Sequence, residues 1–152
     1  MPTESQLSVP YAAARTLANI SNAQRIGRTI PADAAASTTT AETLIGRVPH
    51  GCTVTSIKLT GGAALTASDT VYATITVYAR DTNGANQVTV ATIVTKITAG
   101  TGNWTALKPV TWTTVANGAL LADWVLSYAV AKASTGTQLP ETQLDVVVSS
   151  NP

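Results

Sequence analysis

Apolar and polar side chains alternate along much of the chain after residue 41. From residue 71 to 79 every second side chain is apolar, and threonine or tyrosine lies between them. Two later runs have the same period, with Trp124, Leu126, Tyr128 and Val130 in phase and then Leu144, Val146 and Val148. Because successive side chains of a strand point to opposite faces, these runs predict strands with one face against a core.

Shorter runs fill the intervals between these segments. Residues 42–49 and 52–61 are two β-prone runs separated by His50 and Gly51, which we expect to form a turn. Residues 87–98 carry apolar side chains in both phases, which predicts a strand that is central or covered on both faces. The Asn83-Gly84 pair before this run suits a tight hairpin turn.

These runs and residues 109–115 predict a fold class. About seven or eight strands follow one another with no helical pattern between them, which indicates an antiparallel β-sandwich or barrel rather than βαβ units. The chain is therefore expected to be all-β and to form an antiparallel β-sandwich.

The beginning of the chain differs from the remainder. Residues 9–28 are rich in alanine and have helical propensity, and residues 30–42 are small, polar and typical of a linker. We therefore divide the chain into an extended or partly helical N-terminal arm with its linker, residues 1–40, and a β-sandwich domain, residues 41–152.

The arm holds three of the nine basic residues, Arg15, Arg25 and Arg28, together with Tyr11 and Leu17 at helix-like spacing. We interpret these five residues as a partner-binding element that orders against a neighbouring protein, with the arginines contacting its carboxylates. A frayed terminus without function is the alternative.

Composition excludes several classes of protein. Charged residues make up 11% of the chain, hydrophobic residues 45%, and the net charge is +1. An apolar fraction this high argues against disorder, and the small net charge argues against a nucleic-acid partner. No run is long and apolar enough for a membrane span, and the first residues lack the pattern of a signal peptide. A surface of threonine and alanine suits burial against protein neighbours, because it leaves the sheet edges with few protecting charges. The alternative is a protein that is low in charge for no functional reason.

Catalytic and metal-binding motifs are missing from the sequence. There is one cysteine, Cys52, and one histidine, His50, so neither a disulfide nor a zinc ligand set is available, and we expect no cofactor. The carboxylates are scattered, and we expect no enzymatic activity. Trp104, in a glycine-flanked loop, is the candidate surface aromatic for stacking on a sugar, whereas Trp112 and Trp124 are expected in the core.

Residues 41–148 resemble the decoration proteins, also called cement or head-stabilisation proteins, of tailed bacteriophages. The segments that carry this resemblance are ETLIGRVPHGCTVTSIKL, GALLADWVLSYAVAKASTGTQLP and the final LDVVV. The resemblance implies a jelly-roll-like sandwich, and a homotrimer at three-fold positions on the capsid exterior that binds the major capsid protein. It implies synthesis in the host cytoplasm, a location in the virion and no catalysis. From charge and hydropathy we expect neither nucleic acid nor a membrane as a partner.

Two other functions stay open beside this one. The chain is alternatively another virion structural subunit, such as a minor shell or tail protein, or a carbohydrate- or receptor-binding module that uses Trp104. On the decoration hypothesis, deletion of residues 1–30 is expected to leave a folded trimer that no longer attaches to expanded capsids.

Overall fold

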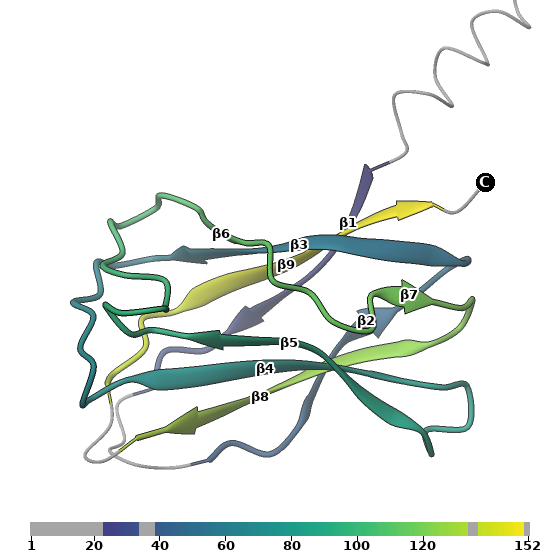
Figure 1. The fold of residues 1–152 in the computed structure, drawn as a ribbon, viewed down its shortest axis with the longest axis horizontal. Coiled ribbons are helices and arrows are strands. Elements are labelled where there is room, and N and C mark those ends of the chain that lie inside the picture. Colours follow the sequence, from purple (N-terminus) through teal and green to yellow (C-terminus); the bar gives the residue numbers. More distant parts are fainter. Residues whose placement is uncertain (1–22, 34–38, 134–136, 151–152) are drawn as a thin grey trace, which may run out of the picture.

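Two antiparallel sheets packed face to face make up the described part of the chain (Figure 1). The computed structural model describes residues 23–33, 39–133 and 137–150, and these parts contain nine strands and no helix. Sheet A has the order β1 (Ala23–Ile30), β9 (Thr142–Ser150), β3 (Cys52–Gly61) and β6 (Val110–Trp112), and β7 (Ala119–Leu120) also pairs with β3. Sheet B has the order β2 (Thr43–Arg47), β8 (Val125–Lys132), β4 (Ala73–Arg80) and β5 (Gln87–Val94). The predicted all-β sandwich is confirmed.

The strand order is that of a jelly roll. Strands β6 and β7 pair with successive parts of β3, at Leu59 to Ile57 and then at Thr53 to Cys52, so they occupy one strand position. Counted in this way, the described residues fill eight positions, and the chain alternates between the sheets except at the hairpin from β4 to β5. Eight strands in two such sheets are the jelly-roll architecture.

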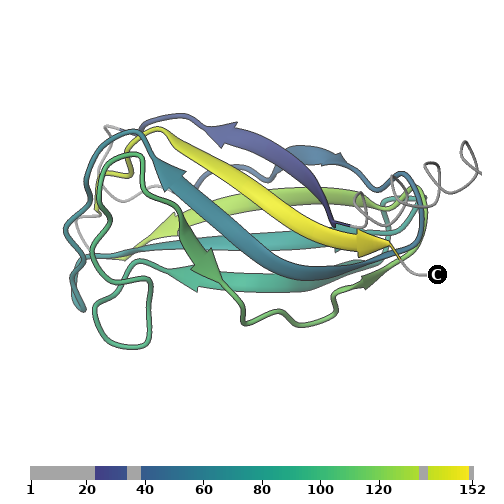
Figure 2. The same cartoon turned by 90° about the horizontal axis from the view of Figure 1, so that it is seen from above.

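The core lies between the two sheets and follows the alternation seen in the sequence. On β4, Ile75 and Val77 are fully buried, and on β9 Leu144 and Val146 are fully buried, while their neighbours in the chain are partly exposed. Figure 2 shows sheet A from above, with β1 at one margin, β6 at the other and sheet B behind it. The period-two runs therefore predicted the inward faces correctly.

Strand β5 was expected to be central or covered on both faces, and this prediction is wrong, because β5 is the edge strand of sheet B. Its ladder with β4 shifts register between Val77 and Tyr78, where one residue of β5 is extra. This bulge puts the neighbours Val90 and Ala91 both in the core. The two apolar phases thus come from a bulge that exchanges the faces halfway along one strand.

Residues 23–30, which the sequence analysis grouped with the N-terminal arm, form strand β1 and are part of the sandwich. They pair with β9 at all eight positions, from Ala23 opposite Ser149 to Ile30 opposite Thr142. Residues 1–22 of the expected arm lie outside the described residues. The strand was missed because only Ile26 and Ile30 carry large apolar side chains in it, and the alanine-rich residues before it favour a helical interpretation.

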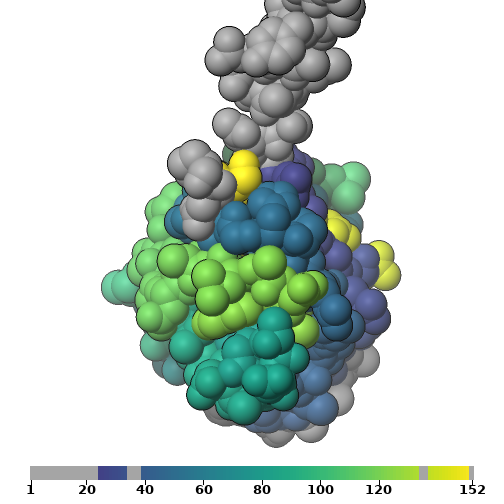
Figure 3. All heavy atoms as spheres, turned by 90° about the vertical axis from the view of Figure 1, so that its right-hand side faces the viewer, coloured from purple at the N-terminus to yellow at the C-terminus, as the bar shows by residue number. Residues whose placement is uncertain are grey.

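The two ends of the sandwich differ in their connections. One end has short turns, at residues 48–51, 81–86 and 121–124, and the longer connections 31–42, 62–72, 95–109 and 133–141 lie at the other end. Strand β1 begins and β9 ends at the short-turn end, which faces the viewer in Figure 3. Residues 1–22 therefore join the sandwich at the short-turn end.

Candidate functional site

The predicted partner-binding residues are only partly described. Tyr11, Arg15 and Leu17 lie outside the described residues, so their role stays a prediction. Arg25 and Arg28 lie on β1, and both are exposed.

The register of β1 places the two arginines on opposite sides of sheet A. Arg25 is opposite Val147, and Arg28 is opposite Leu144, whose side chain is buried in the core. Since residues directly opposite one another project from the same face, Arg28 projects on the inner side at the margin and Arg25 on the outer side. No ion pair among the described residues involves either side chain. The two charges flank the strand rather than form one patch.

The outer edge of β1, meaning the backbone on the side away from β9, is open. In an antiparallel pair every second residue directs both its N–H and its C=O away from the partner strand. No hydrogen bond within the described part of the chain reaches these groups on β1. The strand is also regular, because its ladder with β9 has no register shift. Another strand can therefore pair along this edge.

The other sheet edges are closed or short. Connecting segments donate hydrogen bonds to three carbonyls of β5: Thr101 N to Val94 O (2.9 Å), Ala116 N to Val90 O (2.8 Å) and Asn117 Nδ2 to Thr89 O (3.0 Å). Strands β6 and β7 have three and two residues, and β2 has five with a register shift. Among the strands described, β1 is thus the long, regular edge without a partner.

A cavity of about 320 Å³ opens beside the end of β1, between β1 and the start of β2. Its wall is mainly apolar and includes Ile30, Thr40, Thr43, Tyr128, Val130 and Leu139. Tyr128 is only 4% exposed, and its hydroxyl has no hydrogen-bond partner among the described residues. The cavity therefore offers the Tyr128 hydroxyl and a few other polar groups within a mainly apolar wall, which is the composition of many ligand or side-chain pockets.

Asp33 lines the mouth of the same cavity and pairs with a buried lysine. Its Oδ2 lies 2.7 Å from Nζ of Lys132, whose side chain has no solvent exposure. A buried ammonium group is tolerated only when it is paired, so this contact fixes the chain directly after β1.

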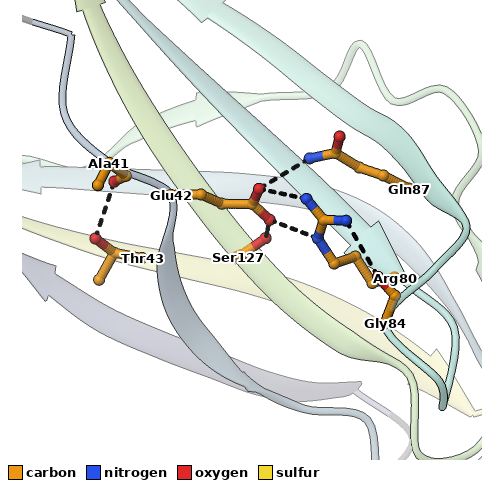
Figure 4. A network of polar contacts seen from close by, with 7 residues as sticks. All are labelled: Ala41, Glu42, Thr43, Arg80, Gly84, Gln87 and Ser127. Carbon is orange, nitrogen blue, oxygen red and sulfur yellow. Dashed lines mark hydrogen bonds and ion pairs between the residues drawn. The ribbon is translucent and has the colours of Figure 1, made fainter.

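A second set of polar contacts holds the residues that lead into β2 (Figure 4). Glu42 accepts two hydrogen bonds from Arg80, from Nε at 2.9 Å and from Nη2 at 2.6 Å. Gln87 Nε2 donates to the same carboxylate at 3.0 Å, and Ser127 Oγ also donates to it. These contacts, led by the Arg80 hydrogen bonds, lower the pKa of Glu42 from 4.5 to about 2.

This network ties the connection between the sheets to the outer face of sheet B. Two positions before Glu42 in the chain, Thr40 N donates to Val130 O at 2.8 Å, and Val130 N donates to Thr40 Oγ1 at 2.9 Å. Residues 40–42 therefore lie along β8, directly beside the cavity.

Trp104 was predicted as a surface aromatic, and this prediction is wrong. Its side chain is 3% exposed, its backbone bridges to Leu65, and its Nε1 donates to Thr101 Oγ1 at 2.8 Å. The loop folds back over the open end of the core, so the glycine-flanked tryptophan fills this end. Trp112 and Trp124, expected in the core, are only partly buried against it.

The remaining chemistry of the described residues is sparse. No group of three or more His, Cys, Asp and Glu side chains converges there into a metal site. His50 lies in the bend between β2 and β3, as expected, and burial raises the pKa of the Cys52 thiol. None of the described residues belongs to a helix that could cross a membrane.

Sequence reasoning missed both the open edge and the cavity. Glu42 and Arg80 are 38 positions apart, so no local spacing connects them. A cavity wall assembled from several segments has no local pattern either. Ile26 and Ile30 are four positions apart with Arg28 between them in the same phase, so the sequence of β1 lacks the period-two alternation of the other strands.

Comparison with known proteins gives little. No family model matches the chain, and no curated protein matches it. Among solved structures, a chain in the structure of infectious bursal disease virus Gx strain is similar at 13% identity and a TM-score of 0.38, over 83% of this chain and 32% of that one. A chain in the structure of infectious bursal disease virus Gt strain is similar at 10% identity and a TM-score of 0.30, over 82% of this chain and 31% of that one. This chain thus spans about a third of the length of those chains, and at these values no conclusion about function rests on the likeness.

Proposed function

We propose that this chain is a non-catalytic structural subunit of a virus particle, which binds the outside of an assembled capsid as a trimer at three-fold positions. The jelly-roll strand order is the observation that supports this most. Jelly rolls build viral capsid domains, and also lectins and cupins, so the fold alone does not choose among these functions.

The outer face of sheet B favours a role in which the protein is covered by neighbours. Its central strands present small or uncharged side chains: Thr74, Thr76 and Tyr78 on β4 and Ala129 and Ala131 on β8. The ion pair on this face, between Arg80 and Glu42, is satisfied within the face. Lys96 adds a charge at the margin of this face, where its ammonium lies 4.1 Å from the centre of the Tyr72 ring. A partner over the centre of the two strands covers mainly uncharged side chains, and the cores of protein interfaces are likewise depleted of charge.

The described residues do not favour the carbohydrate-binding alternative. It depended on Trp104 as an exposed ring, and Trp104 is buried. The alternative of a minor shell or tail subunit shares the fold and differs in assembly.

Binding of this kind stabilises a shell by mass action, because the subunit binds only the assembled lattice. A trimer that contacts several shell subunits gains further, since its second and third contacts are effectively intramolecular. Neither effect requires a catalytic group.

The direct test is cryo-electron microscopy of particles of the virus that encodes this chain, with light scattering of the purified chain. We expect a jelly roll protruding at three-fold positions of the capsid exterior, and a discrete trimer in solution. Closed shells formed by the chain alone would indicate a shell subunit instead. Particles that lack the chain altogether would overturn the proposal.

A further inference from the structure

We propose that the outer edge of β1 binds an extended acidic segment of a partner protein, which adds to sheet A as a further strand and inserts one apolar side chain into the cavity beside Ile30. The proposal rests on the proposed function only for the identity of the partner, a subunit of the particle shell. The recognition chemistry follows from β1 and its surroundings.

The backbone supplies the first part of the recognition. Strand β1 has eight residues without a bulge, and its outward N–H and C=O groups have no partner among the described residues. An added strand pairs with such groups through main-chain hydrogen bonds, and neighbouring pockets then select its side chains. Strand β5, of equal length, is closed to this mode of binding by Thr101, Ala116 and Asn117.

Charge supplies the second part. Arg25 and Arg28 are exposed, belong to no ion pair of the described chain, and project on opposite sides of sheet A. A paired strand also projects side chains to both sides, so two carboxylates three positions apart can meet both arginines. The same charges act against a second copy of β1 as the occupant, because pairing two such strands brings arginines together.

The cavity supplies the third part. It begins at Ile30, on the same side of sheet A as Ile26, and lies between β1 and β2. The two edges approach closely at Gly46, where a Cβ would lie 2.7 Å from Cγ2 of Ile26, so the opening is confined to the Ile30 end. An inward side chain of the added strand at that end enters an apolar space. The unpartnered Tyr128 hydroxyl in its wall can accept or donate one hydrogen bond.

A synthetic peptide tests this site on the full-length chain. The probe is a short, end-capped peptide of alternating valine and threonine, with two glutamates three positions apart and a leucine near one end. We expect binding by fluorescence anisotropy, and protection of alternate amides of β1 from hydrogen exchange. Methylation of alternate peptide nitrogens is expected to abolish binding, and replacement of the leucine by alanine to weaken it several-fold.

The arginines are tested by charge reversal. The double variant Arg25→Glu and Arg28→Glu is expected to bind the glutamate peptide roughly tenfold more weakly and to prefer a peptide with lysines at the same positions. Lys108→Glu, a change at an exposed residue of the 95–109 connection, is the matched control and is expected to leave the affinity unchanged. Both substitutions lie at exposed positions, and thermal unfolding confirms that each variant is folded.

Several results would overturn the proposal. Absence of peptide binding, binding without protection of β1, or equal affinity for the glutamate and lysine peptides would each do so. Protection of β1 in the isolated chain that is lost on deletion of residues 1–22 would assign the edge to the chain's own N-terminal segment. Protection that rises with chain concentration would assign it to a second copy.

Failure of the proposed function has a different signature. A chain that binds the peptide along β1 but is absent from particles retains the edge site and overturns the virion role. A chain found on particles with β1 still exposed to exchange retains the role and overturns the edge site.

Discussion

Strands β1 and β5 are both eight-residue edge strands, one in each sheet, and their outer edges differ in how they are protected from pairing with another strand. Strand β5 carries a bulge, and three of its carbonyls accept hydrogen bonds from connecting segments. Strand β1 is regular, unpaired on its outer edge and flanked by Arg25 and Arg28. Proteins commonly protect sheet edges with bulges, covering loops or charges. Here the bulge and the covering segments close one edge, while charges leave the other open to a partner of opposite charge.

The connections that follow the two strands also differ. The chain after β1 is held by two ion pairs, Lys132 with Asp33 and Arg80 with Glu42. No ion pair of the described residues holds the chain after β5: the buried Thr95 accepts a hydrogen bond from Ala73 N through its Oγ1 at 2.9 Å, and the Asp69 carboxylate accepts two from Thr98, at 2.8 and 2.9 Å. Stability should therefore depend on ion pairing near β1 more than near β5.

The largest effect is expected from removing β1 itself. Deletion of residues 1–30 should abolish cooperative thermal unfolding, because the loss of β1 exposes the core at β9 and costs more than about 5 kcal/mol. Deletion of residues 1–22, which leaves the strand intact, is the control and should keep the melting temperature within a few degrees. A folded protein without residues 1–30, as the sequence analysis expected, would show that β1 is dispensable.

The buried ion pair after β1 should give the next largest effect. Asp33→Ala removes this carboxylate from the Lys132 ammonium, which has a further interaction besides it, so the loss should be about 1.5–3 kcal/mol in the free energy of unfolding measured with urea. Adding Lys132→Met should restore most of that loss. An unchanged free energy of unfolding in Asp33→Ala would contradict this prediction, because it would mean that water or other groups replace the carboxylate fully.

Glu42 should make this region sensitive to acid. Its pKa is about 2 in the folded protein against 4.5 for the ordinary group, so its contribution is complete above pH 4.5 and disappears as pH falls toward 2. Allowing for the partial exposure of the pair, we expect about 1–2 kcal/mol across this range in urea unfolding. Glu42→Gln should flatten this part of the profile, and an unchanged profile would contradict the assignment.

The smallest effect is expected at the closed edge. Asn117 donates its side-chain amide to Thr89 O and has a positive φ of 49°, which glycine also adopts easily. Asn117→Gly should therefore cost only about 0.5–1 kcal/mol, through the lost hydrogen bond, and speed exchange of the Ala116 amide. A much larger loss would mean that the cover of β5 is structurally essential.

The strands that could be predicted from the sequence are those buried on one face only, because such burial makes apolar and polar residues alternate along the strand. Strands β4, β8 and β9 are buried on one face, so Ile75, Leu126 and Val146 fall in phase with their apolar neighbours. At the margins burial is weaker and the pattern fades, as in β1, or changes phase at a bulge, as at Val90 of β5. The candidate site lies at such a margin, where tertiary pairing rather than local sequence decides the structure.

Hydrogen exchange of the chain, free and bound to particles, compares the two edges most directly. Alternate amides of β1 should exchange quickly in the free chain and slowly on the particle, while the amides of Thr101 and Ala116, which close β5, should be protected equally in both states. A β1 that is already protected in the free chain, or that stays exposed on the particle, would contradict the central claim that this edge is where the partner binds.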